Sequence, residues 1–436
     1  MKAQILYGIG NIKLTERERP APRVGEALIK VSSCGICGSD IPRVYKSGAH
    51  NMPLIPGHEF AGTIVGYDSK QDTASDDLSG SSNSEAKVVR CGNPILSTGK
   101  RVGIFPLIPC MKCPQCKSLH YEMCENYNYL GSRRDGGFAE YVSVPVWNLL
   151  PLPDEVTDEE AAMLEPMAVA VHAMRRALGA EPVRSFLNEA NCTNDDTDVS
   201  SSGAEPISFD FDSSIVVCGL GTIGLLMALF LKDAGFTNVL CIGNKDIQKK
   251  KLLEMGYSES CFCDVRYGNP VAFINEKTAG RGADCYFECI GRSESYEQAV
   301  KCTAPLGTVM LVGNPASDME LSKDTYWKIL RNQLTILGTW NSSYYGPVDE
   351  TMPATVAPQS TNTCTDTSSY ILNPMDDWQY VLSRLTAWKQ LSNGLDQPHF
   401  SPADLITHRF GLDELDNGLD IMHRKSEEYV KILVKI

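Results

Sequence analysis

The chain has 436 residues, a formal net charge of −14 and 43% hydrophobic residues. This length suggests two or three domains, and the hydrophobic content is sufficient for buried cores. We do not expect so acidic a chain to have nucleic acid as its main partner, because a phosphate backbone requires concentrated Lys and Arg. An anionic small substrate stays compatible, since it responds to local charge.

Residues 1–168 have a mostly β pattern. Short apolar strands, such as 26–32 and 62–66, are separated by turns rich in glycine and proline, for example 53–57. The N-terminal segment MKAQILYGIGNIKL has no apolar signal core, and no stretch approaches 18 apolar residues. We therefore expect no targeting segment and no membrane partner.

Three motifs in this part of the chain carry candidate metal ligands. Cys37 lies in SCGICGSD, His58 and Glu59 lie in PGHEFAG, and Glu165 lies in MLEPMA. A thiolate, an imidazole and a carboxylate from Cys37, His58 and Glu165 would leave a fourth position open, as in catalytic zinc sites. Each residue alone is more often structural, and their spacing does not decide between the two interpretations.

Four cysteines in one polar loop form a more specific metal motif. The spacing is C-x2-C-x2-C-x7-C, over Cys110, Cys113, Cys116 and Cys124. Steps of two residues let successive thiolates converge on one ion, and four thiolates close a tetrahedral site, so we predict a structural zinc. The other cysteines of the 16 show no framework spacing. Reduced thiols in a long chain favour the cytoplasm.

Residues 169–340 alternate between strand and helix signals. The expected strands are 214–218, 238–242, 284–289, 308–312 and 334–338, and the expected helices are 222–234, 246–255 and 293–304. Alternation of this kind indicates parallel strands joined by crossover helices. The predicted fold class is α/β, with a β-rich domain followed by a doubly wound parallel sheet. Residues 341–436 return to mixed elements and end in the strand-like YVKILVKI.

Three polar stretches, 68–99, 184–213 and 349–370, interrupt this pattern. They are rich in Ser, Thr, Asn and Asp, and such segments bury too little apolar surface to offset chain entropy. We interpret them as surface insertions, with a lid over an active site as the alternative.

A glycine-rich turn follows the first strand of the alternating region. In VVCGLGTIG, Gly219, Gly221 and Gly224 follow an apolar strand, and Thr222 and Ile223 open an apolar helix. In this context the motif predicts a dinucleotide site. The first glycine allows the tight turn, the second lets the backbone approach the pyrophosphate, and the third lets helix pack on strand.

The end of the second strand bears on which dinucleotide binds. NAD sites usually place an acid here to hold the ribose hydroxyl, but this strand ends in Gly243, Asn244 and Lys245. A missing carboxylate removes repulsion toward a 2′-phosphate, and Lys245 with Asn244 offers donors. Asp246 lies nearby, but it is expected to cap the next helix. The pattern therefore favours NADP, with NAD as the alternative.

Taken in order, GICGSD, GHEFAG, the four-cysteine loop, GGFAEY, EP and GLGTIG resemble the zinc-dependent medium-chain dehydrogenases of the alcohol dehydrogenase superfamily. The resemblance implies a GroES-like catalytic domain formed from residues 1–168 and 341–436, with a Rossmann domain at 169–340. It also implies that Cys37, His58 and Glu165 bind catalytic zinc, with Glu59 as a direct or alternating ligand. Two zinc ions per chain are therefore expected.

Within the superfamily, segments 42–50, 131–141 and 328–340 look like those of enzymes that act on polyol phosphates such as galactitol 1-phosphate. The substrate implied is a polyol or polyol phosphate, oxidised at a secondary alcohol. Butanediol, L-threonine or another polyol are alternatives, and a zinc-stabilised nucleotide-binding protein without catalysis is a further one. Gly243 departs from this subgroup, whose members resemble NAD users.

Mechanistic roles follow from the same motifs. Ser39, two residues after Cys37, is the expected first proton acceptor, with the capping of a turn as the alternative. Asp40 is expected to orient His58. Arg133 and Arg134 are candidates for a substrate phosphate.

The apolar strand 334–338 would lie at a sheet edge, where bare edges invite pairing, and the resemblance implies a homodimer or a homotetramer built from it.

Overall fold

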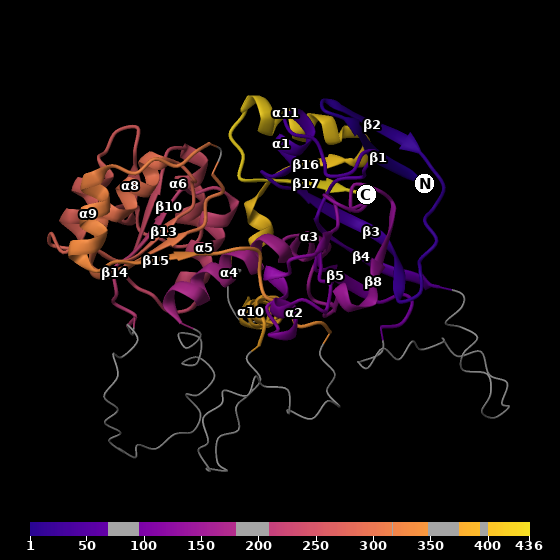
Figure 1. The fold of residues 1–436 in the computed structure, drawn as a ribbon, viewed down its shortest axis with the longest axis horizontal. Helices are drawn as coiled ribbons and strands as arrows, with labels where there is room; N and C mark the ends of the chain where they lie inside the picture. The colour runs from indigo at the N-terminus through magenta and orange to yellow at the C-terminus, as the bar shows by residue number, and fades with distance from the viewer. Residues whose placement is uncertain (69–95, 180–208, 316, 348–374, 393–399) are drawn as a thin grey trace, which may run out of the picture. The chain divides into compact units, whose positions relative to one another are not determined.

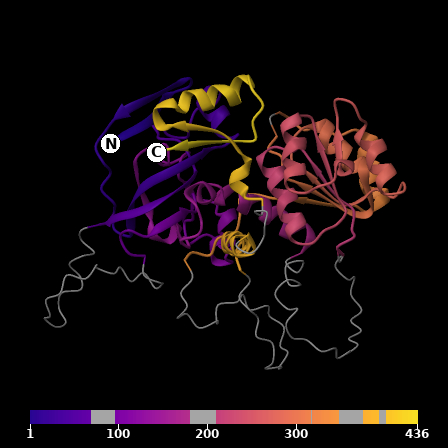
Figure 2. The same cartoon turned by 180° about the vertical axis from the view of Figure 1, so that it is seen from behind.

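A computed structural model describes residues 1–68, 96–179, 209–315, 317–347, 375–392 and 400–436. They form two compact units, Met1–Ala168 with Ser342–Ile436, and Val169–Asn341. Figure 2 shows that both chain ends lie in the first unit. The three predicted polar insertions fall largely outside the described residues. Within those residues, no helix is both long enough and apolar enough to cross a membrane.

The first unit is built on a seven-stranded sheet with the order β16-β17-β3-β4-β5-β9, in which β8 also pairs with β3. Two small sheets, β1-β2 and β6-β7, accompany it. The strands are β1 Lys2–Gly8, β2 Asn11–Glu16, β3 Glu26–Ile36, β4 Glu59–Tyr67, β5 Arg101–Ile104, β6 Leu107–Ile108, β7 Asn128–Tyr129, β8 Tyr141–Pro145, β9 Leu149–Pro151, β16 Ile406–Gly411 and β17 Lys431–Lys435.

Short helices surround this sheet. They are α1 Asp40–Tyr45, α2 Pro114–Lys117, α3 Asp158–Ala162, α10 Asp377–Ser392 and α11 Leu415–Arg424. Helix α4, Leu164–Leu178, begins in the first unit and continues into the second. The N-cap of α3 is Thr157, whose side chain accepts a hydrogen bond from the backbone N–H of Glu160. The Glu160 side chain in turn accepts from the backbone N–H of Thr157, which completes a capping box at the start of the helix.

The C-terminal segment completes the first unit's core. Strand β17 pairs antiparallel with β3, with Val434 opposite Cys34, so the last strand lies beside one of the first. Both strands are buried along nearly their whole length. Apolar residues from both chain segments therefore form one core, which is the arrangement expected for a domain made from two ends of the chain.

The second unit is a six-stranded sheet of order β12-β11-β10-β13-β14-β15 in which every neighbouring pair is parallel. Its strands are β10 Ile215–Cys218, β11 Val239–Gly243, β12 Phe262–Asp264, β13 Ala283–Glu288, β14 Thr303–Leu311 and β15 Thr335–Gly338. Its helices are α5 Thr222–Asp233, α6 Asp246–Glu254, α7 Pro270–Lys277, α8 Ser293–Cys302 and α9 Lys323–Asn332.

The strand order of this sheet reverses after β12. The chain moves outward from β10 to β12, returns to the centre at β13 and then moves to β15 at the other edge. Right-handed crossovers therefore put α5 and α6 on one face and α8 and α9 on the other (Figure 1). The predicted α/β class and doubly wound sheet are confirmed. The analysis did not predict β12, α7 or α9.

Candidate active site and cofactor site

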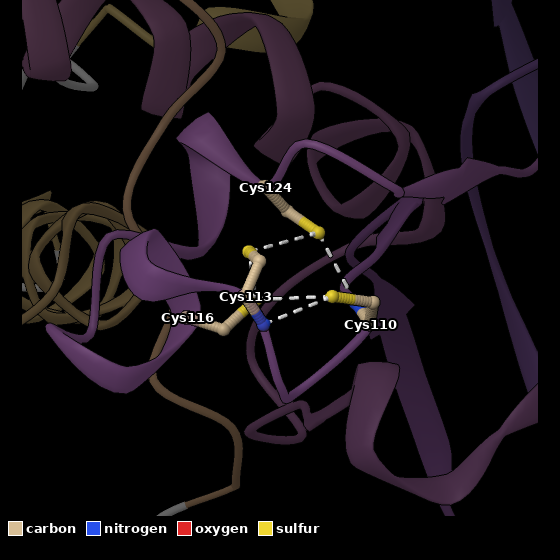
Figure 3. Close-up of side chains that lie close together, drawn as sticks. All are labelled: Cys110, Cys113, Cys116 and Cys124. Atoms are coloured by element: carbon tan, nitrogen blue, oxygen red, sulfur yellow. Dashed lines mark hydrogen bonds between the residues drawn. The ribbon is translucent and has the colours of Figure 1, made fainter.

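The four-cysteine loop brings its sulfur atoms together, as Figure 3 shows. The Sγ of Cys113 lies 3.4 Å from that of Cys116 and 3.9 Å from that of Cys124, and Cys110 lies 4.0 Å from Cys116. These separations are far longer than a disulfide. They match the edge of a tetrahedron, about 3.8 Å, that follows from Zn–S bonds of about 2.3 Å.

Local backbone geometry makes this convergence possible. Cys113 directly precedes the single-turn helix α2, and Cys116 lies within it. Met111 turns the chain with a φ of 59°. The backbone N–H groups of Lys112 and Cys113 lower the pKa of the Cys110 thiol to about 6. A thiolate is the form that binds metal, so the loop suits a closed, structural zinc site.

The second cluster is assembled from distant segments of the first unit. Cys37 follows β3, and His58 and Glu59 stand at the start of β4, which pairs with β3. Ligand atoms of these three residues all lie within 4.8 Å of one another. His58 and Glu59 are buried and Cys37 is partly so.

Glu165 lies near this cluster, but its carboxylate is not one of the three converging groups. It opens helix α4, and the Tyr129 hydroxyl donates to its Oε1 at 3.3 Å. Burial raises the pKa of Glu165 to about 7, against the opposing influence of His58. The Tyr129 ring also contacts the His58 ring edge-on, with centroids 5.8 Å apart.

Asp40 ties the cluster to helix α1. Its Oδ2 accepts the backbone N–H of Cys37 at 2.9 Å, and its Oδ1 forms an ion pair with Arg43. His58 Nδ1 lies 3.7 Å from the same Oδ1, within charge contact but beyond a hydrogen bond. Asp40 is completely buried, and its carboxylate holds the backbone at Cys37 in place, whereas the predicted orienting hydrogen bond to His58 is not formed.

The chemistry of these groups fits a bound cation. Cys37, Glu59 and Glu165 are three acidic groups in one buried region, and burial raises the pKa of the Cys37 thiol. His58 Nδ1 is buried without a hydrogen-bond partner among the described residues. A divalent metal would favour the ionised forms of these groups, which burial alone disfavours. A thiolate, an imidazole and a carboxylate are also typical zinc ligands.

Ser39 lies between Cys37 and Asp40 at the N-terminus of α1. Its side chain makes no capping hydrogen bond, although it occupies the N-cap position. Its backbone N–H approaches Cys37 Sγ at 3.5 Å. The Ser39 side chain therefore does not cap α1.

The predicted phosphate-binding turn lies at the centre of the second unit, between β10 and α5. Gly219 has a φ of +95°, a conformation that favours glycine. A Cβ on Gly224 would lie 2.1 Å from Gly219 O, whereas one on Gly221 would meet nothing within 4 Å. Gly221 thus leaves space beside the start of α5, where Thr222 and Ile223 form the first turn.

At the end of β11, neighbouring side chains fill the space that a side chain on residue 243 would need. A Cβ on Gly243 would lie 2.6 Å from Gln248 Oε1 and 3.0 Å from Leu220 Cδ1. The Gln248 oxygen accepts the backbone N–H groups of Asn244 at 2.9 Å and Lys245 at 3.2 Å. A neutral carboxamide therefore occupies the space beside Gly243.

Two carboxylates lie close to this corner. Arg266 forms ion pairs with both Asp246 and Asp264, and Asp264 ends β12, the strand next to β11. Asp246 is the first residue of α6 and is exposed, and Lys245 occupies the N-cap position, so the expectation that Asp246 caps this helix is wrong. Their charges are largely offset by the guanidinium between them.

The proposed phosphate partners Arg133 and Arg134 are engaged elsewhere. Arg134 pairs with Glu26 at 2.7 Å and donates to Ser143 O at 3.2 Å. Arg133 stacks over the Tyr127 ring at 4.1 Å and donates to its carbonyl. Arg43, by contrast, is linked to the metal cluster through its ion pair with Asp40.

Three contacts of these sites escaped the sequence analysis. Lys431, the first residue of β17, forms a buried ion pair with Glu59. The other two are the hydrogen bonds of Tyr129 and Gln248 described above. Only Lys431 left a trace in the sequence, because a lysine stands inside the apolar strand YVKILV. Tyr129 and Gln248 have no pattern that separates them from ordinary surface residues.

Comparisons with known proteins agree with this geometry. The family model of the alcohol dehydrogenase GroES-like domain matches residues 23–154, and that of the zinc-binding dehydrogenase matches residues 222–357. The chain is 31% identical over 318 residues to galactitol 1-phosphate 5-dehydrogenase of Escherichia coli K12, and the matched region covers 72% of this chain and 75% of that protein. It is 38% identical over 334 residues to L-galactonate-5-dehydrogenase of the same strain, covering 75% and 79%.

A solved structure extends the likeness to the fold. The crystal structure of galactitol-1-phosphate dehydrogenase from Escherichia coli matches with a TM-score of 0.73 at 26% identity, over the whole of both chains. The resemblance inferred from the sequence motifs is thereby confirmed. The chain belongs to the zinc-dependent alcohol and polyol dehydrogenase family, and it is an oxidoreductase of that family.

Proposed function

We propose that the protein transfers hydride between a secondary alcohol of a polyol or polyol phosphate and NADP. The observation that carries the proposal is the buried convergence of Cys37, His58 and Glu59, with Glu165 beside them. The similarity to galactitol 1-phosphate 5-dehydrogenase supports the substrate class.

Each residue of the site has a part in the proposed chemistry. Cys37 and His58 would hold zinc together with Glu59, whose carboxylate converges with them, or with Glu165 beside them, and the metal would supply Lewis-acid polarisation of the substrate hydroxyl. Ser39 accepts the hydroxyl proton and passes it outward. Asp40 holds the backbone at Cys37 in place, and Arg43 balances its charge. The dinucleotide supplies the hydride acceptor, held by Gly219, Gly221 and the N-terminus of α5.

NADP is the proposed cofactor because the end of β11 presents no carboxylate. Gly243 and Gln248 are neutral, and Lys245 offers a charged donor within the same turn. A charged hydrogen bond contributes about 1.5–3 kcal/mol. Asp246 and Asp264 are the counter-argument, and their pairing with Arg266 reduces it.

We propose two zinc ions per chain, one in each cysteine-containing cluster.

We also propose a homodimer or homotetramer. Strand β15 ends the sheet, and among the described residues it pairs only with β14. Nearby α9 exposes Tyr326, Trp327 and Leu330, as expected for a surface that a second copy covers. The described cysteines are free thiols, which is consistent with a cytoplasmic protein. Light scattering at micromolar concentration tests the assembly, and a monomer alone would contradict it.

An activity panel tests the reaction itself. Polyols, polyol phosphates, 2,3-butanediol and L-threonine should each be offered with NAD and with NADP, while the absorbance of the reduced cofactor is followed. We expect the highest kcat/KM for a polyol or its phosphate with NADP. Preference for butanediol or threonine would overturn the substrate assignment, and no turnover with any alcohol would overturn the proposed reaction.

A further inference from the structure

A cavity of about 200 Å³ lies at the start of β3 in the first unit. Its lining comes from the loop between β2 and β3, from the segment before β8 and from β8 itself. None of the described residues that line it belongs to the metal cluster or to the glycine-rich turn. Sites for drug-sized ligands measure roughly 300–1,000 Å³, so this cavity suits a smaller ligand.

Charged side chains dominate the wall of the cavity. Three arginines and two acids line it, namely Arg17, Arg23, Arg134, Glu26 and Asp135. They leave one positive charge in excess, in a chain whose formal net charge is −14. A fourth guanidinium, that of Arg19, lies 4.0 Å from the ring centroid of Tyr141, which also lines the cavity.

The Glu26 carboxylate is engaged through both of its oxygens. Oε1 forms an ion pair with Arg134 at 2.7 Å. Oε2 accepts the Ser143 hydroxyl at 2.6 Å and the backbone N–H of Arg23 at 3.2 Å. Arg134, a candidate for a substrate phosphate on the sequence, is therefore fixed in this wall and neutralised there by Glu26.

The Asp135 carboxylate is engaged in the same way. Oδ1 accepts the backbone N–H of Ile55 at 3.0 Å, and Oδ2 pairs with Arg17 Nη1 at 3.2 Å. Among the described residues, no carboxylate pairs with the guanidinium of Arg23, which is exposed. Arg23 thus carries the positive charge that the wall does not neutralise, and Arg17 keeps further N–H donors.

We propose that this cavity binds the phosphate group of a small molecule, or inorganic phosphate, through Arg23 and Arg17. A guanidinium presents paired N–H donors that match the oxygens of a phosphate. The side chains of Ile55, Tyr141 and Val142 complete the wall and can contact an organic part of the ligand. The proposal does not depend on the proposed reaction, because the cavity shares no residue with the site of that reaction.

Isothermal titration calorimetry with inorganic phosphate tests the proposal. The enzyme should be saturated with its dinucleotide, so that the glycine-rich turn is occupied. We expect one phosphate site per chain. The affinity should fall as the NaCl concentration rises, because salt screens charges that are open to solvent. No heat of binding at millimolar phosphate would overturn the proposal.

Two variants assign the binding to the cavity. Arg23→Gln should weaken phosphate binding by about tenfold or more, because a charged hydrogen bond is lost. Ala21→Glu should weaken it to a similar extent, since Ala21 is an exposed residue of the wall and the new carboxylate repels an anion. Ala21→Glu removes no contact of Glu26 or Asp135. It therefore carries the test if Arg23→Gln does not fold.

Arg281→Gln is the matched control. Arg281 lies in the second unit, pairs with Asp284 and has a side chain that is 57% exposed. The variant loses the same charge without touching the cavity, so it should bind phosphate like the wild type. Unchanged affinity in Arg23→Gln and Ala21→Glu would place the phosphate elsewhere. Equal weakening in Arg281→Gln would reveal only an effect of net charge, and either result would overturn the proposal.

Glycerol 3-phosphate distinguishes the two sources of the phosphate group. If it binds at least about tenfold more tightly than inorganic phosphate, and Arg23→Gln weakens both, the cavity takes a phosphorylated organic molecule. Equal affinities would assign the cavity to inorganic phosphate. Tighter binding of citrate than of either phosphate would overturn the choice of phosphate as the ligand chemistry.

Discussion

The two cysteine-containing clusters are built in opposite ways. The four-cysteine loop draws all its ligands from residues 110–124, whereas the open cluster draws on β3, β4, α4 and the C-terminal strand. In the loop, four sulfur atoms converge at tetrahedral separations, and as thiolates they would more than offset the charge of a divalent ion. In the open cluster, one thiolate is surrounded by carboxylates, an arginine and a lysine. A site closed by its own loop serves stability, and a site assembled from distant strands can leave a position for chemistry.

The largest effect expected from this difference is the loss of activity in Cys37→Ser. Lewis-acid catalysis is worth several kcal/mol, so turnover should fall by about a thousandfold or more. The melting temperature should stay close to that of the wild type, because the core around β3 does not depend on the thiolate. Steady-state kinetics and thermal unfolding test both parts, and a variant with more than a tenth of wild-type activity would contradict the assigned role.

Chelation should separate the two sites in the wild type. Metal analysis should find two zinc ions per chain, and mild chelation should remove one of them together with the activity. The closed site should keep its metal, because four thiolates must be displaced together. Adding zinc back should restore turnover. Loss of both ions at the same rate, or full activity with one ion or none, would break the comparison.

Cys113→Ser should act on stability. Thiolate–zinc closure contributes of the order of 10 kcal/mol to small zinc domains, and even a part of this would lower the melting temperature by roughly 10 °C in a domain of this size. Cys261→Ser is the control, because Cys261 is a partly exposed free thiol outside both clusters. Equal melting temperatures for the two variants would show that the loop needs no metal.

A smaller effect is expected at the start of β3, the strand that leads to Cys37. Glu26 is buried; Arg134 and Ser143 overcome the effect of burial and lower its pKa from 4.5 to about 2. The folded state therefore gains stability above pH 4.5 that is lost as the pH falls toward 2. Glu26→Gln should cost about 2 kcal/mol at pH 7, less than the shift alone gives, because Arg134 is partly open to solvent.

Denaturant titrations at several pH values check this prediction. The difference between Glu26→Gln and the wild type should shrink below pH 4.5, while metal content stays the same at pH 7. A difference that does not change with pH would mean that packing, not charge, is responsible. A loss of metal would show that the two ends of β3 are coupled.

The smallest effect is expected at the cofactor corner of the other unit. Lys245→Ala should raise the KM for NADP by roughly tenfold and leave that for NAD nearly unchanged, because only the 2′-phosphate uses the charge. Lys250→Ala, an exposed lysine on the same helix, should change neither. A wild type that already prefers NAD tenfold would contradict the proposed role of Lys245.

The same contrast explains what the sequence predicts. The spacing of Cys110 to Cys124 was sufficient to predict that the four cysteines converge, because all four lie in one short segment. The glycine turn was equally readable, since a strand, a loop and a helix follow one another along the chain. Cys37, His58 and Glu165 became a set only through the family resemblance, because strand pairing and register decide their meeting.

The missed contacts have the same origin. Lys431 meets Glu59 only because β17 and β4 flank β3 and because Gly35 lacks a side chain, and no spacing rule contains either fact. Gln248 fills the space beside Gly243 because α6 begins with a turn that aims it back at β11. The sequence showed that an acid was missing there but not what replaces it.

The long separation within the Lys431 contact has a consequence for the order of synthesis. Its hydrogen bond to Ile36 O joins residues 395 positions apart, whereas the Val169–Asn341 unit is one continuous segment. Domains fold as units while the chain emerges, so the second unit can be complete before the first. Until residue 431 has been made, Glu59 has no ammonium to hold it. The buried carboxylate of Glu59 therefore gains this counter-charge only when the last strand joins the sheet.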